Sequence, residues 1–318
     1  MKNILVVTLS NIGDVIMTTP VIMALAAQFP EAKITVLVGP KAYAILEKSP
    51  QIHQLIAYHK KAGFIAKWRL LKELRKNRYD GIVDLRNTPI PALLNCKKRS
   101  PFIRRFRKIN RRERHQEILD MMGLGVPNPP PFQFFDATDE QSSLEKLRSR
   151  GIMDTAGWIV VAPGAASTQK RWPATHFQEV IRPLAAETGK KALLVGAGNE
   201  RPIAEAVAQG LAETVVLCGE TTLPETAALL SRASLVLAND SAIMHLGFEL
   251  GVPTVGIFGP TDHEKYGHTG EKFRIAREDA STCSCHSQPR RDAERDCFHG
   301  LGPEQVLKLC RALLPDRP

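Results

Sequence analysis

The sequence over residues 1–38 is MKNILVVTLSNIGDVIMTTPVIMALAAQFPEAKITVLV. It opens with a β-branched apolar run, Ile4–Val7, which is followed by a polar loop at Thr8–Gly13. Apolar residues then recur at helical spacing over Val15–Phe29, and a second apolar run follows at Ile34–Val38. A strand, a helix and another strand in this order predict neighbouring parallel strands, because a parallel pair needs a crossover connection.

The same pattern begins again in the second half of the chain. Trp158–Ala162 is an apolar run, Pro163–Arg171 is a loop of small and polar residues, and a helix is expected from Pro173 to Gly189. Proline suits the first helical position, and glycine suits the end of a helix. Further elements are expected as a helix at Lys67–Lys76 and strands at Gly81–Leu85, Ala192–Val195, Val215–Leu217, Leu235–Ala238 and Thr254–Phe258.

Two halves that begin with the same unit predict an α/β fold of two doubly wound, Rossmann-like domains that face each other across a cleft. A segment rich in proline and polar residues, 125–156, separates the halves. We therefore expect domains at 1–150 and 151–318, and we leave open a return of the last helix to the first domain. Ligands of such sheets bind at the carboxyl ends of the strands, so the loops there are expected to line the site.

The composition is that of an ordinary globular protein, with 318 residues, 43% hydrophobic and 24% charged. It excludes disordered, collagen-like and disulfide-scaffold proteins. No apolar run approaches the ~18 residues of a membrane span. The short apolar run near Met1, interrupted by Asp14, does not fit a secretory signal. Six cysteines in a chain of this length do not indicate a disulfide framework, so we expect a cytoplasmic protein.

The formal net charge of +10 is concentrated in the first half of the chain. Residues 1–157 contain 26 Lys/Arg and 14 Asp/Glu, a charge of +12, whereas the remainder contains 17 and 19, a charge of −2. The excess lies in Lys60–Arg78, with eight basic residues and one acid, and in Lys97–Arg114, with ten and one. Such a field attracts nucleic acid, anionic lipid headgroups or a phosphorylated substrate; the alternative is a solvated helix face.

Gly13 and Asp14 lie where the first predicted loop meets the first predicted helix. The glycine permits a tight turn or a close approach by a ligand. Asp14 then suits a general base that accepts a hydroxyl proton, and equally suits an acid in the first turn of a helix.

Lys170 and Arg171 precede a helix N-terminus and follow Ser167 and Thr168. Free N–H groups, hydroxyls and two cations together predict an anion site, most simply for a diphosphate, against the alternative of a basic surface loop.

Glu200 follows a Gly-Ala-Gly segment, 196–198, which is only a partial dinucleotide fingerprint and argues against NAD. This carboxylate could accept hydrogen bonds from ribose hydroxyls, or could be a solvent-facing acid in a first helical turn. Asp240 and Ser241 could cap the next helix or bind sugar hydroxyls and phosphate, and a catalytic role for His245 is less expected than a structural one.

A cluster of thiols and imidazoles near the C-terminus is a weak candidate for zinc. It contains Cys283, Cys285, Cys297 and His299, with His286 beside them. The Cys-X-Cys spacing is tighter than that of most zinc sites, so a surface loop with free thiols is the default interpretation and no metal is expected.

These motifs, in this order, resemble glycosyltransferase family 9, the ADP-heptose:lipopolysaccharide heptosyltransferases, which have the GT-B fold. The resemblance runs from Met1 to about Leu313. The resembling segments are Ser10–Pro20, Arg114–Gly123, Lys170–Pro173, Gly196–Glu200, Asn239–His245 and Gly259–Thr261.

The resemblance implies a role for each matching residue. Asp14 matches the family's catalytic base, Lys170 the cation on the donor diphosphate, and Glu200 the acid that holds the ribose. The family usually has glycine where this chain has Ala242, a departure that concerns the geometry or the identity of the donor. The donor-binding set then comprises Gly13, Ser167, Thr168, Lys170, Glu200, Gly219, Thr221, Thr222, Asp240, Ser241, Ala242 and His245.

The resemblance therefore implies an inverting glycosyltransferase that moves a sugar, heptose by analogy, from an ADP-sugar to an anionic saccharide acceptor such as the lipopolysaccharide inner core. No cofactor is expected besides the nucleotide-diphospho-sugar substrate, and no nucleic-acid partner is expected. The basic first half could meet a membrane surface, which would make a cytoplasmic protein peripheral on the inner membrane.

Three other interpretations remain open. A nucleotide-sugar epimerase of similar two-domain fold would consume the donor without any acceptor. A nucleic-acid-binding protein without catalysis would bind oligonucleotides with a steep salt dependence and would not need Asp14. A family member that has lost activity and serves as a binding module has Ala242 as its sequence support.

Overall fold

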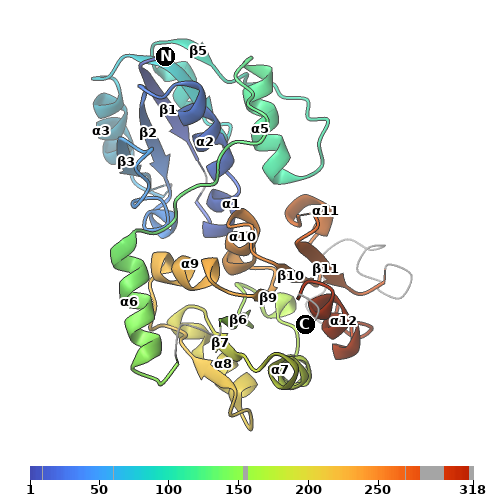
Figure 1. Ribbon diagram of the computed structural model, residues 1–318. Coiled ribbons are helices and arrows are strands. Elements are labelled where there is room, and N and C mark those ends of the chain that lie inside the picture. The colour runs from blue at the N-terminus through green and yellow to red at the C-terminus, as the bar shows by residue number, and fades with distance from the viewer. Residues whose placement is uncertain (9, 60, 153–156, 269, 280–296, 315–318) are drawn as a thin grey trace. The chain divides into compact units, whose positions relative to one another are not determined.

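The computed structural model describes the chain except residues 9, 60, 153–156, 269, 280–296 and 315–318 (Figure 1). The chain divides into two compact units, Met1–Phe135 and Asp136–Pro318. The division falls inside the expected linker region, at 135–136 rather than at 150–151. Each unit is a parallel sheet with helices on its faces, so the predicted fold class is confirmed.

The first unit contains a five-stranded parallel sheet in the order β3-β2-β1-β4-β5. Its strands are β1 (Asn3–Val7), β2 (Lys33–Val38), β3 (Gln54–Ala57), β4 (Tyr79–Asp84) and β5 (Cys96–Arg99). Its helices are α1 (Ile12–Ile16), α2 (Thr19–Gln28), α3 (Phe64–Leu74), α4 (Ile90–Leu93) and α5 (Arg111–Met121), with a 3₁₀ turn η1 (Pro40–Ala42).

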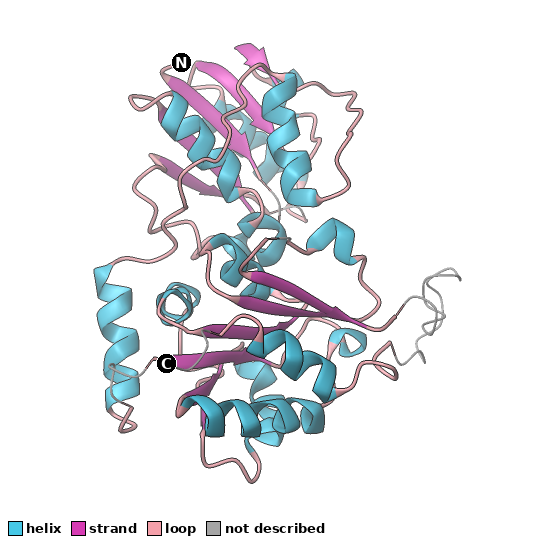
Figure 2. Ribbon diagram, turned by 45° about the vertical axis from the view of Figure 1, so that its right-hand side comes forward, coloured by secondary structure: helices cyan, strands magenta, loops and turns pink. Residues whose placement is uncertain are grey.

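The second unit contains a six-stranded parallel sheet in the order β11-β10-β9-β6-β7-β8. Figure 2 shows the strands and helices of the chain in different colours. Its strands are β6 (Trp158–Ala162), β7 (Lys191–Leu194), β8 (Thr214–Val216), β9 (Leu235–Asn239), β10 (Thr254–Phe258) and β11 (Phe273–Arg277). Its helices are α6 (Ala137–Arg148), α7 (Ala174–Thr188), α8 (Arg201–Ala208), α9 (Leu223–Ser231), α10 (Ala242–Glu249), α11 (His263–Tyr266) and α12 (Pro303–Arg311), with 3₁₀ turns η2 (Thr168–Lys170) and η3 (Gly198–Glu200).

Helix α6 belongs with the second unit because it packs on α9. Lys146 of α6 donates to Glu225 of α9 at 2.6 Å, and Ser142 donates to the same carboxylate at 2.5 Å. Helix α12, whose return to the first unit the sequence leaves open, packs against α7, β10 and β11 of the second unit.

The single helix expected over 15–29 is two helices in the structure. Pro20 has no N–H to offer the carbonyl of Ile16, and the hydroxyl of Thr19 donates to that carbonyl instead, at 2.8 Å. Thr18 donates its hydroxyl to the carbonyl of Val15 at 2.6 Å, which ends α1. The break separates the short α1 from the buried α2.

Most other expected elements are present within two or three residues of their expected ends. Pro173 is the N-cap residue of α7, one position before the first helical residue, whereas the sequence assigns it to the first helical position. Gly189 ends that helix in the left-handed region, with φ of 68°. The edge strands β3, β5 and β11 are absent from the expected set. No helix among the described residues is long and apolar enough to cross a bilayer.

The strand orders fix where ligands can bind. In the first sheet the winding reverses between β1 and β4, and in the second between β6 and β9. Loops that leave the carboxyl ends of such neighbouring strands diverge to opposite faces and leave a crevice between them. These two switch points are therefore the first places to examine for a site.

Candidate functional site

At the switch point of the second unit, a lysine and an aspartate form a largely buried ion pair. Lys170 follows β6, and Asp240 follows β9. The Lys170 ammonium donates to Asp240 Oδ2 at 2.7 Å, with the lysine about one-third exposed and the aspartate buried. The pair places a cation and an anion at the point where an anionic ligand of this sheet would bind.

The N-terminus of α10 lies directly beside this pair. Ser241 is the N-cap of α10, but its hydroxyl caps no N–H of the helix. That hydroxyl is buried, and within the described part of the chain it has no hydrogen-bond partner. A buried hydroxyl without a partner costs free energy, so this one fits a ligand oxygen at the helix N-terminus.

Two further predicted residues belong to the same helix. His245 is buried, with its Nε2 4.0 Å from Asp240 Oδ1. Ala242, at the position where glycine is usual, is the first residue of α10 and is half-buried.

Asn239, at the end of β9, fixes the loop that carries Lys170. Its side chain donates to the carbonyl of Pro163 at 2.7 Å and accepts from the backbone N–H of Trp172 at 3.2 Å. The side chain is fully buried, so both bonds are made away from water. In the sequence, Asn239 stands out only as part of the motif Asn239–His245; its position at the end of a strand, next to Asp240, is the signal for its role.

The Glu200 carboxylate rests against two glycines. A Cβ on Gly164 would come within 2.3 Å of the Glu200 carboxylate, and a Cβ on Gly196 within 2.7 Å. Oε2 of Glu200 accepts from the N–H of Ala197 at 2.8 Å. Among the described residues nothing donates to Oε1, so this oxygen can accept from a ligand hydroxyl. Gly164 is a residue that sequence reasoning missed, because its role depends on a contact with a distant loop.

The remaining predicted donor residues divide into two groups. Gly219, with φ of 77°, brings its loop against Gly198, where a Cβ would be 2.7 Å from the Gly198 Cα. Thr222 caps α9, its hydroxyl accepting from the N–H of Glu225, and the Thr221 hydroxyl bonds that of Thr226 at 2.9 Å. The two threonine hydroxyls thus stabilise the local loop.

Ser167 and Thr168 lead into the 3₁₀ turn that carries Lys170. Ser167 is half-buried at the cap of η2, and Thr168 is exposed. The structure thus places both hydroxyls in the Lys170 loop, as the sequence predicts.

The Cys218 thiol, near Glu200, is not activated. Burial, with the nearby Glu200 carboxylate, raises the pKa of Cys218 to about 12. The thiol therefore stays protonated at neutral pH and is unsuited to act as a nucleophile or metal ligand.

In the first unit, Asp14 lies in the first turn of α1, just beyond the carboxyl end of β1. The side-chain amide of Asn11, the N-cap, donates to Asp14 Oδ2 at 2.9 Å. Asp14 is half-buried and Gly13 precedes it in the same turn. The carboxylate is thus held by one amide and remains accessible from one side, as a general base must be.

Asp14 lines a hollow of about 760 Å³ that also contains three cations. Across the switch point, Arg86 after β4 donates to the Ser10 hydroxyl after β1 at 2.8 Å, and its guanidinium lies 5.7 Å from the ring centre of Tyr58. Lys41 and Lys61 also line this hollow. The hollow combines one carboxylate with positive charge and fits an anionic ligand that carries a hydroxyl.

Comparisons with known proteins identify the family of the chain. The family model of glycosyltransferase family 9 (heptosyltransferase) matches residues 67–295. The chain belongs to glycosyltransferase family 9.

Relatives and solved structures of this family extend the match to nearly the whole chain. A lipopolysaccharide heptosyltransferase 3 of Escherichia coli is 31% identical over 281 residues, 79% of this chain and 82% of the relative. The crystal structure of a family 9 glycosyltransferase from Veillonella parvula has a TM-score of 0.83 at 23% identity and covers 98% of this chain and 97% of its own. The E. coli heptosyltransferase WaaC with ADP-2-deoxy-2-fluoro heptose has a TM-score of 0.70 at 21% identity and covers 97% and 99%.

The family membership confirms the resemblance seen in the sequence and the GT-B fold. The chain is a glycosyltransferase, an enzyme that uses a nucleotide-sugar donor. Among the interpretations left open by the sequence, transfer is therefore favoured over epimerisation and over nucleic-acid binding.

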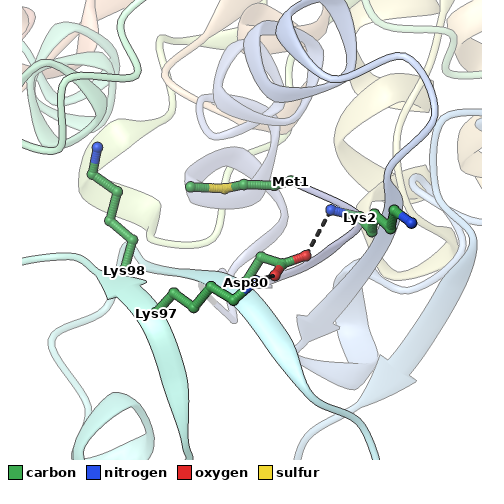
Figure 3. Close-up of a pocket in the computed structure, with 5 residues that line it drawn as sticks. All are labelled: Met1, Lys2, Asp80, Lys97 and Lys98. Carbon is green, nitrogen blue, oxygen red and sulfur yellow. Dashed lines mark hydrogen bonds and ion pairs between the residues drawn. The ribbon is translucent and has the colours of Figure 1, made fainter.

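A second hollow of this family 9 enzyme lies at the amino ends of strands of the first sheet, the ends opposite to Asp14 (Figure 3). It is lined at the amino ends of β1, β4 and β5 by Met1, Lys2, Asp80, Lys97 and Lys98, and its volume is about 630 Å³. Asp80 accepts from the N–H of Lys2 at 2.7 Å and pairs with Lys97 at 2.8 Å, and these bonds hold its pKa far below the ordinary range. The contacts fix the start of β1 to β4, so we assign this hollow a structural role.

The candidate metal ligands fall mainly outside the described residues. Cys283, Cys285 and His286 are not described, whereas Cys297 is buried and His299 is exposed. In the described ranges, no three His, Cys, Asp or Glu side chains are grouped so that they could hold a metal ion.

Proposed function

We propose that this enzyme transfers heptose from ADP-heptose to an anionic saccharide of the lipopolysaccharide core, with inversion at the anomeric carbon and with Asp14 as the general base. The observation that carries the donor half of the proposal is the Ser241 hydroxyl, buried and unpartnered among the described residues, beside the Lys170–Asp240 pair at a helix N-terminus. This combination fits the oxygens of a diphosphate.

The donor would be held by two separate groups of residues in the second unit. Lys170, the Ser241 hydroxyl and the first N–H groups of α10 would bind the diphosphate, and Glu200 Oε1 would accept from a ribose hydroxyl. As the bond from the sugar to the diphosphate breaks, negative charge grows on the departing ADP. A fixed cation and oriented N–H groups stabilise that charge without reorganising during the reaction.

The acceptor would occupy the hollow around Asp14. Its hydroxyl oxygen attacks the anomeric carbon, its proton passes to Asp14, and ADP leaves from the opposite face of the sugar. A single displacement of this kind inverts the anomeric centre. Lys41, Lys61 and Arg86 would hold phosphate or carboxylate groups of the acceptor, which supports an anionic saccharide over a neutral one.

The known relatives support these assignments. The E. coli relative is a lipopolysaccharide heptosyltransferase, and the solved WaaC structure holds an ADP-heptose analogue. A lipid-anchored core saccharide would be met at the cytoplasmic face of the inner membrane, which is where we propose that the enzyme acts.

The test combines a donor screen with analysis of the product. Thermal unfolding is first measured with ADP, UDP, GDP and CDP. ADP-heptose is then supplied under three conditions: without acceptor, with the intact core saccharide, and with the dephosphorylated core saccharide. We expect stabilisation by ADP alone, since a ligand at ~100 times its dissociation constant adds ~2.7 kcal/mol. We expect ADP release only with acceptor, and a product of inverted anomeric configuration by NMR.

Each half of the proposal can fail separately. Stabilisation by UDP instead of ADP would remove the ADP-sugar donor. Conversion of the donor without acceptor would indicate an epimerase, and a retained anomeric configuration would exclude Asp14 as base of a single displacement.

A further inference from the structure

Helix α3 of the first unit has large apolar residues besides those that pack on the sheet. Leu70, Leu71 and Leu74, toward its C-terminal end, pack toward the sheet, as expected for a helix between two strands. Toward its N-terminal end, Phe64, Ile65 and Trp68 are 80%, 69% and 52% exposed. Three large apolar residues on one ridge of an exposed helix are unusual on a soluble surface, where such patches mark interaction sites.

Basic residues surround this ridge. The ammonium of Lys72 lies 5.8 Å from the ring centre of Trp68. Glu73 is the one acidic residue of α3. The exposed basic residues on and just beyond the helix are Lys61, Lys67, Arg69, Lys72, Arg75 and Lys76.

Helix α4 extends the same surface. Arg75, just after α3, donates to the carbonyl of Leu93 at 3.1 Å, which places the end of α4 beside the end of α3. Leu93 is 45% exposed. We define the α3–α4 surface as the exposed large apolar and basic residues of these two helices and of the two positions just after α3: Phe64, Ile65, Lys67, Trp68, Arg69, Lys72, Arg75, Lys76 and Leu93.

We propose that the α3–α4 surface docks on an anionic lipid bilayer, with Phe64, Ile65 and Trp68 inserted at the level of the headgroups and the lysines and arginines against lipid phosphates. An amphipathic helix with aromatic and aliphatic residues on one side and Lys/Arg around them is suited to lie in the interface plane. Lysine stems can cover an apolar neighbour while their charges stay among the headgroups, as Lys72 is placed to do over Trp68.

Charge distinguishes the bilayer from the other occupants. The first unit contains 23 Lys/Arg and 9 Asp/Glu in residues 1–135, a formal charge of +14. A second copy of the chain would bring the same charge to the contact, so self-association through this surface is opposed. No residue of the α3–α4 surface is among the proposed catalytic or donor-binding residues, so the inference stands whichever sugar is transferred.

The wild-type chain contains its own probe for this docking. It has three tryptophans, and Trp158 and Trp172 are 0% and 1% exposed, whereas Trp68 is on the ridge. The full-length protein is titrated with vesicles of phosphatidylcholine alone or mixed with phosphatidylglycerol, at low and at physiological salt. We expect a blue shift of the emission and quenching by brominated acyl chains, with the anionic vesicles only, weaker at the higher salt.

Paired variants separate the apolar and the electrostatic contributions. We expect Phe64→Ser with Ile65→Ser to weaken vesicle binding by on the order of 10- to 100-fold. Lys67→Gln with Lys72→Gln is expected to weaken it by on the order of 10- to 30-fold. The matched control for charge is Arg148→Gln with Lys308→Gln, two exposed positions of the second unit, which we expect to leave binding unchanged.

Three results would overturn the inference. The first is equal binding of the wild type and the Phe64→Ser/Ile65→Ser variant to anionic vesicles. The second is a blue shift of Trp68 that grows with protein concentration in the absence of lipid, together with a dimer in sedimentation, which would assign the surface to a second copy. The third is no binding to any vesicle. Unchanged melting temperature and ADP stabilisation of the variants confirm that they remain folded.

Discussion

The two switch points of this molecule have the same strand winding but differ in the charged side chains that surround them. In the second unit, Lys170 and Asp240 join across the reversal as a largely buried ion pair. In the first unit, Ser10 and Arg86 join across it, and the hollow beside them contains one carboxylate among several cations. The switch point of the second unit thus has charges that compensate each other, whereas that of the first unit has an excess of positive charge.

Under the proposed function, the difference shows how one fold can serve two kinds of ligand. A nucleotide diphosphate is small and of fixed shape, so the proposed donor site can be made of two glycines, a helix N-terminus and one cation. A phosphorylated saccharide on a lipid is larger and more variable, and the proposed acceptor site is a wide basic hollow with a single carboxylate. The total charges follow the same division, +14 for residues 1–135 and −4 for residues 136–318.

The largest effect is expected at the switch point of the first unit. Asp14→Asn removes the proposed proton acceptor but keeps the size of the side chain. We expect kcat to fall by about 10²- to 10⁴-fold, the usual contribution of a general base, with ADP binding unchanged. Steady-state kinetics and calorimetric titration with ADP measure the two quantities. The control is Glu31→Gln, which changes an exposed carboxylate of the same unit. A wild-type rate for Asp14→Asn would mean that Asp14 is not the general base.

The switch point of the second unit is expected to respond in two ways. Lys170→Met should lower kcat/KM by about 10²- to 10³-fold, because the departing diphosphate loses its cation. It should also lower the free energy of unfolding by about 2–4 kcal/mol, because Asp240 remains buried without its partner. The double variant with Asp240→Asn should recover the melting temperature but not the activity. Recovery of both would mean that Lys170 acts only on stability.

A smaller and more selective effect is expected at Gly164, which lies against the Glu200 carboxylate. Gly164→Ala places a methyl group where the Glu200 carboxylate now lies, and the end of that flexible side chain can move away. We expect ADP affinity to fall by about tenfold while the melting temperature changes little, since a hydrogen bond to a charged group is lost. Gly302→Ala, where a Cβ would meet no atom, is the matched control. Equal ADP affinity in both variants would separate Glu200 from the nucleotide.

The smallest effect is expected at the ion pair that joins α6 to α9. Burial alone would raise the pKa of Glu225, but bonds from Lys146, Ser142 and the Thr222 N–H lower it below its ordinary value. The stabilisation from this pair is therefore complete at neutral pH and is lost as pH falls from the ordinary glutamate range, ~4.3, through the folded-state value.

We expect Glu225→Gln to lower the free energy of unfolding by about 1–3 kcal/mol at pH 7, with the difference from wild type shrinking below about pH 4. Urea unfolding at several pH values measures it. A difference that does not depend on pH would assign the effect to packing of α6 on α9 and not to the ion pair.

Much of this architecture could be predicted from the sequence because the deciding strands are fully buried. Runs such as Ile4–Val7 and Trp158–Ala162 are continuous apolar segments, typical of parallel strands covered on both faces. The edge strands β3 and β5, QLIA and CKKR, were missed because an edge strand is short and half-exposed and lacks that pattern.

The candidate site divides along a similar line. Asp14, Lys170, Glu200 and Asp240 could be singled out as candidates because each lies in or just after the loop that follows an apolar strand. The contact of Gly164 with Glu200 could not be found, since a pattern of nearby residues contains no information on which distant loops touch. The same reason applies to the buried Ser241 hydroxyl, whose lack of a partner among the described residues is visible only in the packed structure.

The break between α1 and α2 has a consequence for how the acceptor side can adjust. Helix α1 has five residues and buries two of them, whereas α2 buries seven of ten. Opening α1 therefore disrupts few contacts, and its local unfolding free energy should lie well below that of α2. The turn that carries Asp14 can thus sample several positions at little cost while the core beneath it stays folded, which would allow the proposed general base to follow an acceptor hydroxyl as it arrives.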